Sequence, residues 1–204
     1  MAYNGSSPYV NTFGSATTSG NLLVSYFNGL AGATPTILSD ASEVWHPIFD
    51  DTATMSGYHN TTWWAISKGC TVVTASESSV GGLAGICSGE WSLVNQIDQG
   101  GSGTVGTGTT TPAITTTHAV ETIIAFWSAN TPFGSAGSTF TFRCGVNFSG
   151  DYYTILGDYG VTSIQTSLTA TPSGGSGGSA GIASFCQGGT VFTKELDAAM
   201  ATWS

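Results

Sequence analysis

The chain is 204 residues long, with 3 Lys and Arg residues against 12 Asp and Glu residues, a formal net charge of −9 and 40% hydrophobic residues. Three cations cannot neutralise a phosphate backbone or hold an anionic membrane surface, so the charge excludes nucleic acids and membranes as partners. The hydrophobic content is sufficient for a packed core and excludes a disordered chain.

Apolar and β-branched runs recur between clusters of Gly, Ser, Thr and Pro, the pattern of an all-β domain. The run at Asn21–Phe27 is almost continuously apolar and predicts a strand covered on both faces. The run at Thr139–Val146 alternates, so Phe140 and Phe142 are expected to face the core. We predict strands, in chain order, at Pro8–Phe13, Asn21–Phe27, Pro35–Leu38, Glu43–Ile48, Thr54–Ser67, Thr71–Ala75, Ala84–Trp91, Val94–Ile97, Val120–Trp127, Thr139–Val146, Tyr152–Leu156, Ser163–Thr169 and Gly181–Cys186.

The number and length of these strands favour two packed antiparallel sheets. Residues 99–111 and 172–181 have the composition of linkers. Because the apolar segments on both sides need each other to complete the sheets, we interpret them as long loops within one domain. Residues 17–24 and residues 116–125 have a weak sequence similarity, which predicts equivalent strands in two halves of the chain.

The two ends differ from the body of the chain. We expect an N-terminal arm at residues 1–12, a sandwich at residues 13–187 and a C-terminal tail at residues 188–204. Thr193–Trp203 is the best helical segment, with Thr193 as its N-cap. So short a helix must dock, either on its own sandwich or on a neighbouring subunit. Its apolar stripe, the candidate subunit contact, is Leu196, Met200 and Trp203.

The four cysteines do not form a metal-binding pattern, because no two are separated by two residues. Each lies in or beside a strand-like run, which favours buried free thiols. Disulfides stay open as the alternative, with three connectivities. The four are Cys70, Cys87, Cys144 and Cys186.

No secretory leader is readable at the start of the chain, and no apolar run approaches the ~20 residues that span a bilayer. We consider two explanations: a mature sequence with an added Met, or a protein made and assembled in the cytoplasm. We prefer the second.

Two motifs of catalytic type lack the required context. Residues 101–106 match GxGxxG, but Pro112 and three threonines follow where a helix is needed. Residues 174–181 contain GxSxG, but all three histidines precede it, at His46, His59 and His118. No set of nucleophile and base remains, so we expect no enzyme, no catalytic residue and no cofactor.

The acidic residues allow two further interpretations. A glycosidase needs only two suitably spaced carboxylates, and loop carboxylates could hold a structural Ca²⁺, although no EF-hand spacing supports one. Most of these residues adjoin glycines or turns, so we interpret them as turn-forming side chains and predict no metal site. They are Asp50, Asp51, Glu90, Asp98, Asp151 and Asp158.

The aromatic residues are the best candidates for contact with a sugar. Trp63 and Trp64 are consecutive in a strand, so their side chains point to opposite faces. Aromatic rings near loops stack on sugars, but they also anchor cores and loops. The candidate glycan contacts are Trp64, Tyr58, Tyr152 and Tyr153.

The order of several motifs resembles a known family. These motifs fall into two groups along the chain. The first group is residues 17–24, Ser39-Asp40, Trp45, Trp63-Trp64-Ala65 and residues 71–74, and the second is residues 83–89, 96–99 and 121–126. This order is similar to that of lectin-like β-sandwich (jelly-roll) domains in phage structural proteins and bacterial surface proteins, over about residues 12–186. Ser42-Glu43-Val44 replaces the usual Gly-Asn before Trp45. The resemblance implies an all-β sandwich and supplies no catalytic residue.

The resemblance leads us to expect a non-enzymatic virion structural protein of a phage, such as a capsid decoration protein, head fibre or tail subunit. It would form a homo-oligomer, contact other virion proteins and be located in the virion after assembly in the host cytoplasm. The alternative is a carbohydrate-binding or adhesin module that binds host glycans and is extracellular or displayed on a surface.

Overall fold

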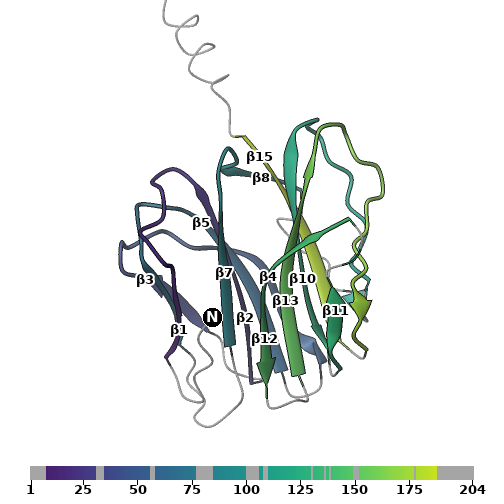
Figure 1. Ribbon diagram of the computed structural model, residues 1–204, viewed down its shortest axis with the longest axis horizontal. Coiled ribbons are helices and arrows are strands. Elements are labelled where there is room, and N and C mark those ends of the chain that lie inside the picture. The colour runs from purple at the N-terminus through teal and green to yellow at the C-terminus, as the bar shows by residue number, and fades with distance from the viewer. Residues whose placement is uncertain are drawn as a thin grey trace, which may run out of the picture.

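The longest apolar runs form the central strands of two antiparallel sheets. The computed structural model describes residues 8–30, 35–55, 58–76, 85–99, 106–107, 110–129, 131–135, 137, 139–148, 152–176 and 178–187. In the first sheet, β2 (Leu22–Leu30) lies between β5 (Tyr58–Ile66) and β7 (Gly85–Trp91), and β4 (His46–Met55) pairs with the outer side of β5 (Figure 1).

The second sheet is built in the same way around β10 (Glu121–Ala129), which lies between β13 (Tyr152–Val161) and β15 (Ser179–Cys186). The strand β12 (Thr141–Phe148) forms one edge beside β13, and β8 (Gln96–Gln99) forms the other beside β15. The short β9 (Gly106–Thr107) also pairs with β15.

Two smaller sheets complete the described structure. One has the order β1 (Tyr9–Thr12), β6 (Val72–Ser76), β3 (Thr36–Ser39), and the other pairs β11 (Phe133–Ser135) with β14 (Ser173–Gly174). Adding eight to each label of the order β4-β5-β2-β7 gives β12-β13-β10-β15, and β3-β6 likewise becomes β11-β14. The first half of the chain (β1–β7) and the second half (β8–β15) therefore repeat one topology, which confirms the predicted equivalence of the strands at Leu22 and Ile123.

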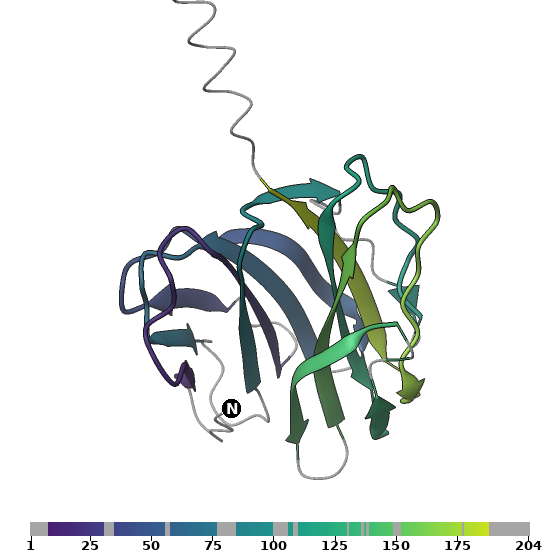
Figure 2. The same cartoon turned by 45° about the horizontal axis from the view of Figure 1, so that its top comes forward.

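The two main sheets face each other across a shared apolar core. Figure 2 shows the first half, purple to teal, on one side of the molecule and the second half, green to yellow, on the other. Val24 and Tyr26 of β2 pack in one cluster with Ile124 and Phe126 of β10. The rings of Tyr26 and Phe126 lie 5.4 Å apart. This sheet-on-sheet packing is that of a β-sandwich.

Each main sheet is also covered on its outer face. Leu23 and Phe27 of β2 pack under the small sheet against Tyr9, whose ring lies 5.5 Å from that of Phe27. On the other side, Ile123 and Trp127 of β10 lie under a cover that includes Ile114, Phe133, Phe140, Leu168 and Ala170. Leu22 to Gly29 are all buried, which confirms the prediction of a strand covered on both faces. The predicted all-β antiparallel class is confirmed. The structure has more layers than the two sheets that were expected.

Two details of the strand prediction are wrong. Ser163–Thr169 is not a strand, because only Leu168 forms a bridge, to Ile114. Phe140 is buried as expected, but Phe142 is 49% exposed. The register of β12 against β13 shifts between Phe142 and Cys144. A bulge of this kind breaks the alternation of faces that the sequence pattern assumes.

The expectation of four free thiols is wrong for one pair. Cys87 of β7 and Cys144 of β12 form a disulfide with a Cα–Cα distance of 6.0 Å, whereas Cys70 and Cys186 are free and buried. The disulfide joins an edge strand of the first sheet to an edge strand of the second. It therefore cross-links the two halves of the chain along one side of the sandwich.

The predicted helical tail, with Leu196, Met200 and Trp203, lies outside the described residues. From the predicted N-terminal arm, Tyr9–Thr12 forms β1 and packs into the body of the protein. Within the described ranges, no helix has the length and apolar character needed to cross a membrane.

Candidate ligand groove between the two halves

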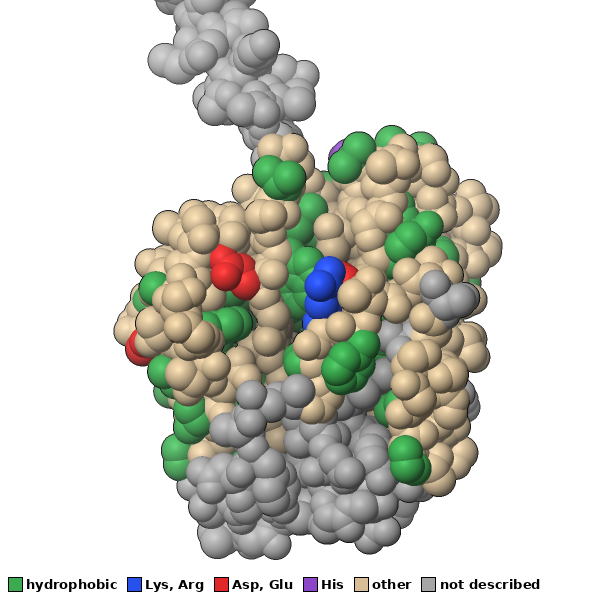
Figure 3. All heavy atoms as spheres, in the orientation of Figure 1, with side chains coloured by type: hydrophobic (Ala, Val, Ile, Leu, Met, Phe, Trp, Pro, Cys, Tyr) green, Lys and Arg blue, Asp and Glu red, His purple; other side chains and the backbone are tan. Residues whose placement is uncertain are grey.

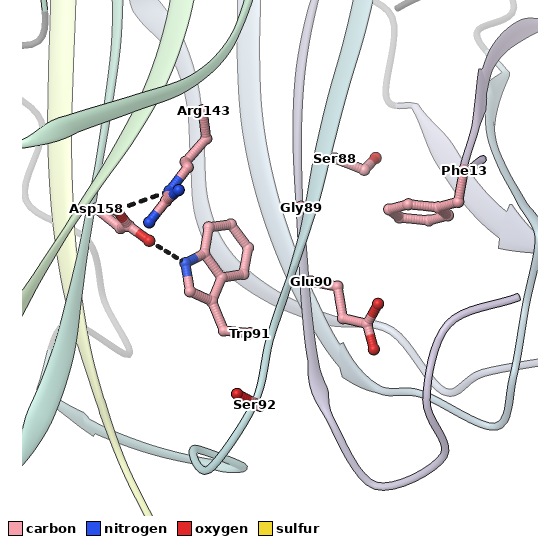
Figure 4. Close-up of a pocket in the computed structure, with 8 residues that line it drawn as sticks. All are labelled: Phe13, Ser88, Gly89, Glu90, Trp91, Ser92, Arg143 and Asp158. Carbon is pink, nitrogen blue, oxygen red and sulfur yellow. Dashed lines mark hydrogen bonds and ion pairs between the residues drawn. The ribbon is translucent and has the colours of Figure 1, made fainter. Parts of the chain in front are cut away.

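A cavity of about 490 Å³ lies where β7 of the first half meets β12 and β13 of the second. In Figure 3 a hollow runs between the two sides of the molecule, with basic, acidic and hydrophobic side chains exposed along it. Figure 4 shows the lining side chains on both sides of β7, the edge strand of its sheet. They are Phe13, Ser88, Gly89, Glu90, Trp91, Ser92, Arg143 and Asp158.

A hydrogen-bonded triad spans the gap between the sheets. The indole Nε1–H of Trp91 donates to Oδ2 of Asp158 at 2.5 Å, and Nε of Arg143 donates to Oδ1 of the same carboxylate at 2.9 Å (Figure 4). Trp91 and Asp158 are only 8% and 6% exposed. Burial is tolerable for this carboxylate because both of its oxygens accept a hydrogen bond and Arg143 supplies the opposite charge.

Gly89 makes room for the orientation of the indole. Residues 89 and 91 point to the same side of β7, because side chains alternate along a strand. A Cβ atom at Gly89 would lie 2.4 Å from Cη2 of Trp91. The ring can therefore fold back along the strand toward Asp158 only when residue 89 has no side chain.

The second carboxylate of the groove is held on the opposite side of β7. Oε1 of Glu90 accepts hydrogen bonds from the backbone N–H of Thr18 at 2.7 Å and from Nδ2 of Asn21 at 2.6 Å. These bonds attach the segment that leads into β2 to the neighbouring edge strand. Glu90 therefore has a structural role that also fixes one wall of the cavity.

The groove offers donors and acceptors of mixed type around two aromatic rings. The side chain of Arg143 is 51% exposed, and its Nη atoms make no hydrogen bond within the described ranges. One arginine against Asp158 and Glu90 leaves a formal charge of −1 among the lining residues. Among the described side chains, neither His46 nor His118 lines the groove, and no nucleophile is paired there with a free base.

A separate cluster lies at the opposite edge of the second sheet. Asp98, His118 and Glu121 each offer one ligand atom, and these atoms lie within 4.8 Å of one another. Burial acts to raise the pKa of Asp98, but hydrogen bonds from the hydroxyl and N–H of Thr117 lower it to about 2. Burial also raises the pKa of Glu121. Among the described residues, this cluster has the donor types that could hold a metal ion.

Of the aromatic residues that the sequence suggested for sugar contact, Trp64 is described with its side chain and does not line this groove. Trp64 packs in the core between the sheets, with the ring of His46 stacked on it at 4.8 Å. Trp63 packs under the small sheet, which confirms that the two tryptophans face opposite sides. For Tyr58, Tyr152 and Tyr153 the structure describes the backbone, in β5 and β13, and not the side chains.

Asp158 is not the turn residue that its neighbours in the sequence suggested, and no sequence motif pointed to Trp91 or Arg143. Asp158 lies within β13, and Asp98 within β8, so neither is the turn residue expected. Asp50 and Asp51 likewise lie within β4. One signal was available: Arg143 is the only arginine in the chain and lies in a strand-like run, where a buried carboxylate partner is expected.

A scan against protein-family models and searches of curated proteins and of solved structures found no match.

Proposed function

We propose that the protein is a non-enzymatic carbohydrate-binding module that binds a neutral saccharide in the groove between its two halves. The observation that carries the proposal is the cavity of about 490 Å³ lined by Trp91, Phe13 and the half-exposed Arg143. Ligand sites prefer the junctions between structural units, and cavities of this size accommodate small ligands. Apolar ring surfaces combined with a few fixed polar groups suit a sugar ring.

The charge of the groove favours a neutral sugar over an acidic one. The lining residues carry a formal charge of −1 and the whole chain −9, so an anionic ligand would be repelled as it approaches. The two Nη groups of Arg143 and the hydroxyls of Ser88 and Ser92 can instead hydrogen-bond to sugar hydroxyls.

The hydrogen bonding of the carboxylates supports binding without chemistry. Asp158 accepts from Trp91 and Arg143, and Glu90 accepts from Thr18 and Asn21. A glycosidase needs one carboxylic acid free to protonate the leaving group and a second carboxylate free to act on the sugar or on water. Because Asp158 and Glu90 already accept hydrogen bonds from the protein, they are suited to binding a sugar and not to cleaving it.

The Cys87–Cys144 disulfide supports display in an oxidising environment, since such bonds are rare in cytoplasmic proteins. We therefore place the module on a virion or bacterial surface. The lectin-like jelly-roll class is part of the proposal. It is supported by the alternation of β1, β3 and β6 in one sheet with β2, β4, β5 and β7 in the other.

A glycan array probed with the full chain, followed by calorimetry on the sugars that bind, tests this function. The variant is Arg143→Gln, with Lys68→Gln as the matched control, because Lys68 is also an exposed cation and lies outside the groove. We expect Arg143→Gln to weaken sugar binding at least about tenfold, the loss of a charged hydrogen bond, and Lys68→Gln to have no effect. Failure to bind any glycan, or equal loss in both variants, would refute the proposal.

A second candidate, the virion structural role, is favoured by exposed apolar side chains. Six large hydrophobic residues are 49–77% exposed, and such side chains are suited to contacts between copies. They are Leu38, Val44, Leu93, Val120, Phe142 and Ile164. Light scattering on the full chain and on a chain ending at residue 190 tests this role. A discrete oligomer is expected for the full chain. A monomer is expected after truncation, because the predicted subunit contacts Leu196, Met200 and Trp203 are then removed. A monomeric full chain would exclude this role.

A further inference from the structure

Three side chains with metal-ligating atoms meet where β8 and the start of β10 lie on either side of β15. Cys186 of β15 is the register partner of both Gln96 of β8 and Glu121 of β10. This arrangement brings Asp98, two residues beyond Gln96, near Glu121 and near His118, which precedes β10. Asp98 is about twenty residues before His118 and Glu121 in the chain, and the pairing of the strands brings them together.

The two distances from the imidazole of His118 are close to the spacing of ligand atoms around one small ion. Nδ1 of His118 lies 3.4 Å from Oδ1 of Asp98 and 3.7 Å from Oε1 of Glu121. Two atoms bound at about 2.1 Å to one tetrahedral ion lie about 3.4 Å apart. All three ligand atoms lie within 4.8 Å of one another, so rotation of the side chains can bring them to one ion.

Glu121 supplies an independent sign that a partner belongs here. Its side chain is 0% exposed, and Oε1 accepts the backbone N–H of His118 at 2.9 Å. Oε2 is buried and makes no hydrogen bond of standard geometry among the described residues, while the Asp98 carboxyl and the Ser184 hydroxyl lie near the Glu121 side chain. Neither Lys68 nor Arg143, the described lysine and arginine, forms an ion pair with it. A buried carboxylate in this state is costly unless a cation or a proton compensates it.

We propose that Asp98, His118 and Glu121 form a binding site for a divalent transition-metal ion of the Zn²⁺ class. Two carboxylates and an imidazole are the N and O donors that Zn²⁺ accepts, with a water molecule completing the tetrahedron. Ca²⁺ fits poorly, because it takes six to eight oxygen ligands. The ion would connect β8 to the start of β10 and so hold the edge of the second sheet.

The surrounding hydrogen bonds would orient the ligands. The N–H of Thr117 donates to Oδ2 of Asp98 at 2.7 Å, and its hydroxyl donates to Oδ1. Such outer contacts fix the direction of a ligating carboxylate. The Thr117 hydroxyl also lies 3.0 Å from Nδ1 of His118. A network of Thr117, Asp98 and His118 that binds no metal is therefore the competing explanation, and the experiment must separate the two.

Calorimetric titration of the EDTA-treated full chain with ZnCl₂ tests the site. We expect one ion per chain, a rise in Tm with Zn²⁺, and reversal of that rise by EDTA. His118→Ala and Asp98→Asn should weaken Zn²⁺ binding at least about tenfold. The matched controls are His46→Ala, an exposed histidine elsewhere, and Asp40→Asn, a carboxylate that likewise accepts from a threonine N–H and hydroxyl. Both controls should bind Zn²⁺ as the unmodified chain does.

Co²⁺ absorption identifies the donors. Tetrahedral d–d bands without thiolate-to-metal charge transfer are expected for a site of two carboxylates and one imidazole, whereas a thiolate band would assign the ion to Cys186 or Cys70. The proposal is overturned by that thiolate band, by absence of stoichiometric binding, or by unchanged affinity in both His118→Ala and Asp98→Asn. Because the groove is separate, sugar binding by an EDTA-treated chain tests the proposed function without reference to the metal.

Discussion

Asp158 in the second half of the chain accepts the indole hydrogen bond of Trp91 in the first half, 67 residues earlier. This bond and the Cys87–Cys144 disulfide lie on the same side of the sandwich, where the edge strands of the two sheets meet. The groove is therefore built at the contact between two repeats of one topology, and its walls depend on that contact.

Replacing Trp91 by Phe keeps an aromatic ring and removes the hydrogen bond to Asp158. Because Asp158 is 6% exposed, we expect the free energy of unfolding to fall by about 1–3 kcal/mol, measured by urea denaturation. Trp45→Phe is the control, since its Nε1–H makes only a 3.4 Å contact with Ser39 in a part-buried position. A change as large in Trp45→Phe would contradict the role of the Asp158 bond.

Replacing Gly89 by Ala forces the Trp91 ring away from its position, because the new Cβ would lie 2.4 Å from Cη2. We expect a loss of about 1–3 kcal/mol in the free energy of unfolding and a shift in the tryptophan fluorescence of the folded protein. Gly160→Ala, in β13, has no heavy atom within 4 Å of its new Cβ and should be nearly neutral. Equal effects of the two substitutions would rule out steric contact as the cause.

Removing the disulfide should destabilise the contact between the halves. Cys87 and Cys144 are 57 residues apart, and loop-closure entropy for a loop of that length is worth about 4 kcal/mol. The double variant Cys87→Ser/Cys144→Ser should therefore lose stability, measured by denaturant unfolding. A reductant should lower the stability of the unmodified chain and leave that of the double variant unchanged. If the reductant leaves the stability of the unmodified chain unchanged, the disulfide does not form.

Thiol labelling should separate the two classes of cysteine. Burial raises the pKa of Cys70 to about 11, and burial likewise raises the pKa of Cys186. At pH 8 the Cys70 thiolate is then a fraction of about one in a thousand, so iodoacetamide should leave the native protein unmodified. Mass spectrometry should show two alkylated cysteines after unfolding and four after unfolding with reductant.

Asp40 should make stability depend on pH in the acid range. Hydrogen bonds from the Thr71 hydroxyl and from the N–H groups of Val72 and Thr71 lower its pKa below 3.8 in the folded state. The unfolded chain therefore binds the proton more readily, so the contribution is fully present above the unfolded pKa of 3.8 and is lost as pH falls from that value through the lower pKa of the folded state. Asp40→Asn should show a smaller fall in urea midpoint between pH 5 and pH 3. An identical fall in both proteins would contradict this assignment.

The local pattern of the chain was enough to predict most strands and the burial of one of them. The unbroken apolar run at Asn21–Phe27 required a cover on both faces, and β2 has one on each side. Alternation was likewise enough to place Trp63 and Trp64 on opposite faces. These predictions succeeded because they depend on backbone periodicity and on the cost of exposing apolar surface, which neighbouring residues determine.

Side chains whose partners come from distant segments were predicted wrongly. Phe142 is exposed because β12 shifts its register against β13 just beyond it, and this bulge depends on the pairing of two strands. Asp158 follows a glycine, which is typical of a turn, yet it lies inside a strand that β10 and β12 flank.

By itself, therefore, the sequence determined an all-β protein with a repeated strand pattern and a strongly acidic charge. Only the tertiary structure decided that Cys87 pairs with Cys144, that Trp91 meets Asp158 and Arg143, and that Asp98 approaches His118 and Glu121. The reason is physical: periodicity is encoded locally, whereas disulfide, hydrogen-bond and ligand geometry depend on how two sheets pack and on which strands lie at their edges.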